Sequence, residues 1–263
     1  MPESSGFIFK SAATTHPGRV RAVNQDAFVE LPQQGLWAVA DGVGGHQQGE
    51  AASQAVVDAV AEIASAPPTG PLVEAVRQGI LGVNRELVQR AHAIGSGTLI
   101  ASTVVALVAE ASRCVCLWAG DSRIYGFREG QLARLTRDHS HVEHLVEQGV
   151  LSREEALHHP EANIILRAVG REDSLELDAA VYDLYAQDKF LLCTDGLTKE
   201  LSDDEIAAIL AQGDCQANCE QLLELALSRT CADNLALIVV DVCQALDDTT
   251  ITQRRRRPHV IPD

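Results

Sequence analysis

The chain has 263 residues, a formal net charge of −16 and an apolar content of 46%. This length is enough for one large domain or two small ones. The acidic balance argues against a general nucleic-acid binder and against docking on anionic membranes, because both functions need basic surfaces. No apolar run reaches the about 18 residues of a membrane span, and the first ten residues lack the pattern of a signal peptide.

The first part of the chain predicts short strands followed by two helices. Apolar runs at 6–15, 27–31 and 36–40 indicate strands. Residues 49–66 place apolar side chains at helical spacing, and the sequence PPTGP at 67–71 ends that helix. A second helix is expected over about 72–92.

The second part predicts several strands in succession and then two more helices. Residues 102–110, 113–120 and 123–135 indicate three strands, the last with a hairpin turn at 128–130. Two further strands are expected at 178–186 and 189–194. Ser202 and Glu205 predict a capping box at the start of a helix. A helix at about 216–230 and a strand at 235–242 complete the pattern.

This order of elements predicts an α+β fold. Strands that follow one another without crossover helices favour mainly antiparallel sheets. We expect one domain over residues 6–245, and a disordered polar tail over 246–263. The seven cysteines show no paired metal-binding pattern, which favours a reduced, cytoplasmic protein without structural disulfides.

Five aspartates stand next to the ends of apolar runs. An Asp at such a position is often only a turn former. If these strand ends meet at one edge of the fold, however, the like charges repel unless a cation lies among them. Carboxylates and backbone carbonyls are the ligands that Mg²⁺ or Mn²⁺ prefer. The pattern therefore predicts a site for two or more metal ions, formed by Asp26, Asp41, Asp121, Asp195 and Asp233.

Six motifs resemble a known family when they are taken together. They are RAVNQDAF (21–28), VADGVGGHQQGEAAS (39–53), WAGDSRIY (118–125), LTRDHS (135–140), FLLCTDGLT (190–198) and CADNLALIVV (231–240). In this order they resemble the bacterial branch of the PP2C metal-dependent serine/threonine phosphatases, over about residues 10–243. The resemblance implies a four-layer αββα sandwich, in which antiparallel helix pairs flank two mainly antiparallel β-sheets and the metals lie at one edge.

The resemblance also implies which residues bind two core Mn²⁺ or Mg²⁺ ions. Asp41 matches the carboxylate that bridges both ions, with the carbonyl of Gly42 on the second. Asp195 and Asp233 resemble ligands of the first ion. Asp26 should serve the second ion, directly or through water.

Two further residues match the family pattern. Asp121 corresponds to a ligand of a third, weaker ion, and Arg21 to the arginine that holds the substrate phosphate through its forked donors. The implied reaction is direct hydrolysis by a metal-activated water, without a covalent phosphoenzyme. Residues at about 140–180 occupy the place of the mobile flap of the family.

The sequence departs from the family in places. Val43 stands where many eukaryotic members have a His proposed as general acid, and His46 is either a substitute proton donor or a structural residue. Ala101-Ser102-Thr103 replaces the usual Gly-Thr-Thr with little expected effect. His141 and His144 could share a helix face and bind zinc, although the flap interpretation is favoured.

The predicted function is hydrolysis of phosphoserine and phosphothreonine in proteins, in opposition to a bacterial Ser/Thr kinase. The alternative is a catalytically silent module that binds phosphoproteins, and the five intact aspartates favour the enzyme. The tail places Thr249 and Thr250 between acids and four arginines. It is either a solvated charged segment or a site that a partner kinase phosphorylates and a phosphothreonine-binding domain recognises.

Overall fold

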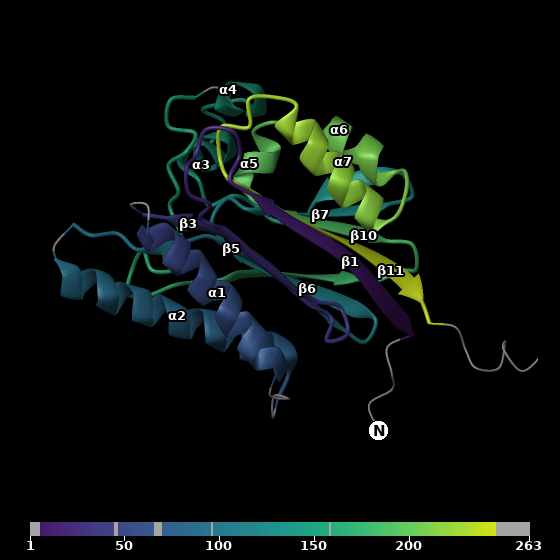
Figure 1. The fold of residues 1–263 in the computed structure, drawn as a ribbon, viewed down its shortest axis with the longest axis horizontal. Helices are drawn as coiled ribbons and strands as arrows, with labels where there is room; N and C mark the ends of the chain where they lie inside the picture. Colours follow the sequence, from purple (N-terminus) through teal and green to yellow (C-terminus); the bar gives the residue numbers. More distant parts are fainter. Residues whose placement is uncertain (1–5, 45–46, 66–69, 96, 158, 246–263) are drawn as a thin grey trace, which may run out of the picture.

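Two antiparallel β-sheets pack face to face, and helices cover the outer face of each sheet (Figure 1). This arrangement is seen in a computed structural model that describes residues 6–44, 47–65, 70–95, 97–157 and 159–245. Among the described residues, none of the helices combines the length and apolar character needed to cross a bilayer.

The first sheet joins the two ends of the domain. Its strands, in spatial order, are β1 (Phe7–His16), β11 (Leu235–Gln244), β10 (Lys189–Cys193), β7 (Arg123–Arg128) and β8 (Gln131–Arg134). All neighbours are antiparallel. Glu129 and Gly130 connect β7 and β8 with φ values of 51° and 80°, which is the left-handed geometry of a tight hairpin turn. The hairpin predicted at 128–130 is therefore present.

The second sheet carries the other half of the sandwich. Its strands, in spatial order, are β2 (Asp26–Leu31), β3 (Leu36–Val43), β5 (Val104–Glu110), β6 (Arg113–Ala119) and β9 (Asp178–Asp183), and β4 (Ala101–Ser102) pairs with β3. These pairs are also antiparallel. The side chains of Trp37, Leu107 and Ile238 are buried between the two sheets and form the central core.

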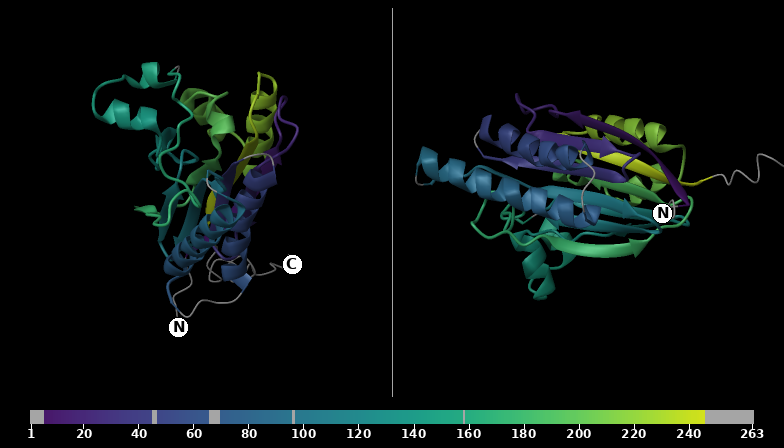
Figure 2. Two further views of the ribbon diagram at one scale, coloured as in Figure 1. Left: turned by 90° about the vertical axis from the view of Figure 1, so that its left-hand side faces the viewer. Right: turned by 90° about the horizontal axis from the view of Figure 1, so that it is seen from below.

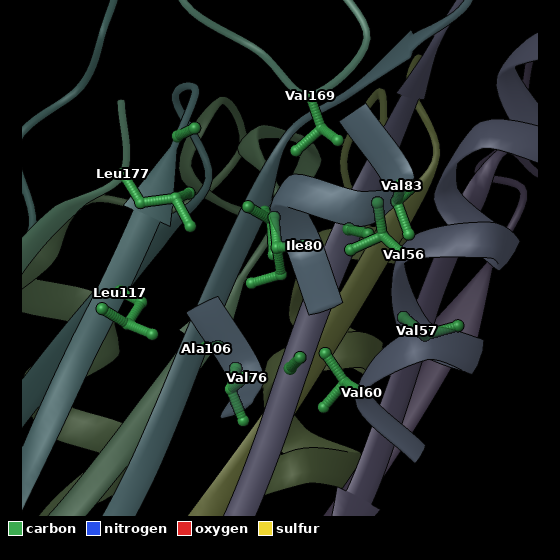
Figure 3. Packing of buried hydrophobic residues seen from close by; sticks show 14 of the residues in the cluster. Val56, Val57, Val60, Val76, Ile80, Val83, Ala106, Leu117, Val169 and Leu177 are labelled. Carbon is green, nitrogen blue, oxygen red and sulfur yellow. The ribbon is translucent and has the colours of Figure 1, made fainter. Parts of the chain in front are cut away.

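Helices α1 (Gln47–Ser65) and α2 (Leu72–Ile94) cover the second sheet. Val56 and Val60 on α1, and Val76 and Ile80 on α2, are four residues apart and therefore lie on one helix face. They pack with Ala106 of β5 and have no exposed surface (Figure 3). Burying each of these side chains contributes about 1.5–3 kcal/mol before entropy is counted. The helical spacing of the sequence thus places both helices on this sheet.

Helices α6 (Asp203–Leu210) and α7 (Cys215–Leu227) pack with the first sheet. The capping box of Ser202 and Glu205 forms as the sequence predicts, with both reciprocal hydrogen bonds. A short helix, α5 (Asp195–Thr198), follows β10 directly and was not expected from the sequence. Because four residues are too few to show helical periodicity, only the tertiary structure reveals it.

The segment at 140–180 ends in the sandwich, where Val169 and Leu177 are buried in the core and β9 begins at Asp178, but its first part lies outside the four layers. It contains α3 (His141–Glu147), which Ser140 caps through the backbone N–H of Glu143, and α4 (Arg153–Leu157). Both helices project from the sandwich (Figure 2).

Candidate metal centre

The five aspartates lie at one end of the sandwich. Asp26 begins β2 and pairs in register with Asp41 on β3, so the two side chains are direct cross-strand neighbours. Asp121 follows β6, Asp195 begins α5 directly after β10, and Asp233 precedes β11. Since β10 ends where the antiparallel β11 begins, Asp195 and Asp233 also lie close together.

A buried threonine connects the two sheets at this end. The hydroxyl of Thr194 donates to Asp26 Oδ2 at 2.8 Å and accepts from the backbone N–H of Ala236 at 2.9 Å. Thr194 follows β10 of the first sheet, whereas Asp26 begins β2 of the second. The contact therefore fixes the position of one acidic side chain relative to strands of the opposite sheet.

Two hydroxyl groups hold the backbone of Asp41. Its N–H donates to Thr103 Oγ1 at 3.0 Å, and its carbonyl accepts from Ser102 Oγ at 3.0 Å. Thr103 Oγ1 also shares a hydrogen bond of 2.7 Å with Ser122 Oγ. Ala101-Ser102-Thr103, which stands in place of Gly-Thr-Thr, thus supplies one hydroxyl to the N–H and one to the carbonyl of Asp41.

Gly42 is required by close approach of another backbone segment. A Cβ at this position would lie 2.0 Å from the carbonyl oxygen of Gly49 on α1. The N–H of Gly42 donates to the carbonyl of Gln25 at 3.0 Å, which joins the strand end to the loop before β2. Any side chain here would push α1 away from the acidic cluster.

The electrostatics show that the five carboxylates act on one another. Burial raises the pKa of Asp41 well above its usual value, and the charges of Asp26, Asp195, Asp121 and Asp233 raise it further. Burial is also the main cause that raises the pKa of Asp26 to about 7 and that of Asp121 to about 8. This concentration of negative charge is unfavourable in a protein without a bound cation.

Three carboxylate oxygens in the cluster are buried without a hydrogen-bond donor, namely Oδ1 of Asp26, Asp121 and Asp195. An unpartnered buried acceptor costs free energy, and an oxygen ligand of a hard divalent ion would no longer be unpartnered. The residues therefore fit Mg²⁺ or Mn²⁺. Within the described part of the chain, no three acidic, His or Cys side chains are already arranged around an ion position.

Two basic side chains form ion pairs with Asp195 and Asp233. Lys199 Nζ lies 2.6 Å from Asp195 Oδ2 and 3.0 Å from Asp233 Oδ2. Arg21 Nε lies 3.0 Å from Asp233 Oδ1, and its side chain is 58% exposed. Burial favours a raised pKa for Asp233, but Lys199 and Arg21 outweigh it and lower that pKa. Lys199 was missed in the sequence, because its contact with Asp195 depends on the short helix α5, which only the tertiary structure reveals.

The loop that carries Arg21 is held by Asn234, which the sequence analysis also missed. Its Oδ1 accepts from the N–H of Gln25 at 2.9 Å. Its Nδ2 donates to the carbonyls of Pro17 and Val23, each at 3.0 Å. Asn234 is therefore a positioning residue for the loop, and its place beside Asp233 in CADNLALIVV is the signal that could have found it.

The histidines considered for zinc have separate partners. His141 Nε2 lies 3.2 Å from Glu161, whereas His144 Nε2 shares a hydrogen bond with Gln148 at 2.8 Å. His46, considered as a proton donor, lies outside the described residues, so its role stays a prediction.

The sequence profile of the family described as protein phosphatase 2C matches residues 16–230. Serine/threonine protein phosphatase PstP of Mycobacterium tuberculosis is 34% identical over 240 residues, which cover 90% of this chain and 45% of PstP. The chain belongs to the protein phosphatase 2C family. Serine/threonine phosphatase stp of Listeria monocytogenes is 34% identical over 235 residues, covering 86% of this chain and 93% of that protein.

Solved structures agree with the assignment to the protein phosphatase 2C family. PppA, a key regulatory component of T6SS in Pseudomonas aeruginosa, superposes with a TM-score of 0.83 at 39% identity, covering 90% of this chain and 99% of that one. The catalytic domain of PstP in complex with two manganese ions gives a TM-score of 0.82 at 31% identity, over 90% and 100% of the chains.

The family and the four-layer α+β fold predicted from the motifs are therefore confirmed. The serine/threonine phosphatase class predicted for the chain is that of these protein phosphatase 2C relatives. The chain spans about half of PstP, at 45% of its length.

Proposed function

We propose that this chain is a metal-dependent protein phosphatase that hydrolyses phosphoserine and phosphothreonine. The observation that carries this proposal is the group of buried carboxylate oxygens without donors at Asp26, Asp121 and Asp195. They lie at the strand ends of a protein phosphatase 2C sandwich. Such an arrangement suits a site that binds cations and, through them, an anionic phosphoryl group.

The proposed ligands of two core Mn²⁺ or Mg²⁺ ions come from both sheets. Asp41 would bridge the ions, and the Gly42 carbonyl would bind the second. Asp195 and Asp233 would bind the first ion, and Asp26 the second. When bound, such ions supply an activated water and neutralise charge on the phosphoryl oxygens.

The remaining site residues have separate proposed roles. Asp121, buried at the end of β6, would bind a third and weaker ion. Arg21 is exposed at the rim and would hold the substrate phosphate through its guanidinium. Asn234 orients the loop that presents Arg21, and Thr103 holds the backbone of Asp41. These contacts keep the phosphate-binding and cation-binding groups in fixed relative positions before substrate arrives.

The segment at about 140–180 is proposed as a flap that borders the substrate site. A pocket of about 760 Å³ lies between this segment and the sandwich, and its lining includes Trp118, Arg134, Glu143 and Tyr182. Glu143 on α3 pairs with Arg134 on β8 at 2.8 Å, so the flap helix is held to a sheet edge by a polar contact. None of the five aspartates lines this pocket, so the pocket does not contain the proposed metal ligands.

A cytoplasmic Ser/Thr kinase is the proposed opposing partner, and its phosphorylated targets are the proposed substrates. The relatives that carry serine/threonine phosphatase names support this assignment. Thr249 and Thr250 lie outside the described residues, so their phosphorylation and recognition by a phosphothreonine-binding domain stay a prediction. Mass-spectrometric mapping with the cognate kinase present would contradict it if both residues remained unmodified.

The proposed function is tested by phosphate release from a phosphothreonine peptide with Mn²⁺, with Mg²⁺ and with EDTA. We expect turnover that requires metal and that falls at least about 100-fold in Asp195→Asn, because a ligand charge is lost. Asp58→Asn, an exposed change on α1 with the same loss of charge, should retain wild-type turnover. Wild-type protein that binds metal but shows no turnover would instead favour the silent binding module.

A further inference from the structure

Lys199 is placed where a cation would be needed. It follows α5 as the C-cap residue, and its ammonium bridges Asp195 Oδ2 and Asp233 Oδ2 at 2.6 and 3.0 Å. Both carboxylates are proposed ligands of the first metal ion. No other basic side chain among the residues that the structure describes is recorded bridging these two aspartates.

We propose that Lys199 is a tethered competitor of the first metal ion. Its ammonium neutralises Asp195 and Asp233 in the metal-free protein and leaves them when a divalent ion binds. The inference rests on the proposed metal site and adds a residue that sets its affinity.

The competition follows from the bonds that each carboxylate makes. Asp233 Oδ1 already accepts from Arg21 and from the N–H of Asn234, and its Oδ2 accepts from Lys199. A metal ion between Asp195 and Asp233 would therefore lie beside the ammonium, where two positive charges repel strongly.

Lys199 is also able to leave. Its side chain is 37% exposed, and lysine carries its charge on a flexible four-carbon stem. Arg21 differs, because its ion pair is with Oδ1 of Asp233 and not with Asp195. Displacement of Lys199 into solvent therefore frees Oδ2 of Asp195 and Oδ2 of Asp233. Arg21 does not have to move for Asp195 to bind a metal ion, because it pairs only with Asp233.

The expected effect is an increase in metal affinity when the ammonium is removed. Ion pairs that are partly exposed are weak, so breaking two of them should change the dissociation constant by only about three- to tenfold. Without Lys199 the two carboxylates also repel each other in the metal-free protein. The melting temperature in EDTA should therefore fall, while the increase caused by Mn²⁺ should become larger.

The test is calorimetric titration of the metal-free protein with Mn²⁺, combined with thermal unfolding in EDTA and in Mn²⁺. The variants are Lys199→Gln, Lys199→Met, which keeps the apolar stem, and Lys199→Arg, which keeps the charge. Lys10→Gln is the matched control, because it removes one charge from an exposed position on β1. We expect Lys199→Gln and Lys199→Met to bind Mn²⁺ about three- to tenfold more tightly, and the other two variants to resemble wild type.

The outcomes separate this inference from the proposed function. Equal or weaker Mn²⁺ binding by both uncharged Lys199 variants would overturn the competition while leaving the phosphatase assignment intact. The same gain in Lys10→Gln would also overturn it, because a change in net charge would then be sufficient. Wild-type protein that binds no Mn²⁺ would overturn both the competition and the proposed metal site.

Discussion

Replacement of Asp26 by Asn should stabilise the metal-free protein while damaging the metal-bound one. Asp26 is 7% exposed and lies directly opposite Asp41 on the neighbouring strand. Burial raises its pKa from 3.8 to about 7; the hydrogen bond from Thr194 opposes this shift, and the charge of Asp195 adds to it. Asn has nearly the same shape and no charge, and its amide oxygen still accepts from Thr194.

The sign and size of this effect on the free energy of unfolding follow from the difference between the pKa of Asp26 in the folded and in the unfolded protein. A carboxyl with a raised folded pKa stabilises the fold below its unfolded pKa, and this contribution is lost as pH rises through the folded pKa. At about pH 8, ionised Asp26 therefore costs the metal-free protein about 4 kcal/mol. At about pH 5.5, where Asp26 is mostly protonated in the folded protein, this cost falls to about 2 kcal/mol.

The assay is urea unfolding in EDTA at these two pH values. The free energy of unfolding of Asp26→Asn should exceed that of wild type by about 4 kcal/mol at the higher pH and about 2 kcal/mol at the lower. Saturating Mn²⁺ should reverse the order, because the wild type gains more from bound ions. A metal-free variant that is less stable than wild type, or a difference independent of pH, would refute the reasoning.

Asp138→Asn is the matched control for this experiment. Asp138 is 8% exposed, almost as buried as Asp26, but its charge is paired with Arg123 at 2.7 Å. Removing one partner of a buried ion pair leaves the other charge uncompensated, and this typically costs about 3–5 kcal/mol. Asp138→Asn should therefore destabilise the protein at both pH values, in contrast to Asp26→Asn.

Three further predictions follow from single contacts. Gly42→Ala should lower the free energy of unfolding by about 3 kcal/mol in urea titrations, because its Cβ would lie 2.0 Å from the Gly49 carbonyl oxygen; wild-type stability would contradict this close approach. Arg21→Lys should raise KM for a phosphothreonine peptide about tenfold with a smaller change in kcat, since an ammonium lacks the forked donors of a guanidinium; an unchanged KM would remove Arg21 from phosphate binding. Burial lowers the pKa of His139, although its hydrogen bond to Asp178 acts in the opposite direction. The stability that neutral His139 contributes is therefore present above about pH 6.5 and is lost as pH falls through its folded pKa. Thermal unfolding from about pH 8 to 5.5 should therefore show a shallower loss for His139→Asn, and parallel curves would argue against the assignment.

The local features of this protein could be predicted from the sequence because their causes are local. The periodic valines of α1 and α2 indicate which helix faces are buried, and Ser202 with Glu205 predicts a helix start within four residues of chain. Apolar runs that end in Asp195 or Asp41 predict strands with acidic ends. Periodicity and capping act over a few residues, so they can be read without knowing the fold.

What the sequence determined by itself was the family, the sandwich and the set of aspartates. Only the tertiary structure decided how these aspartates are held. Asp26 and Thr194 are 168 residues apart, and their hydrogen bond depends on how the two sheets pack. Lys199 reaches Asp233 because β10 and β11 are antiparallel neighbours and α5 turns the chain back over their ends. Such contacts arise from sheet register and packing, which depend on the whole chain at once rather than on any one segment.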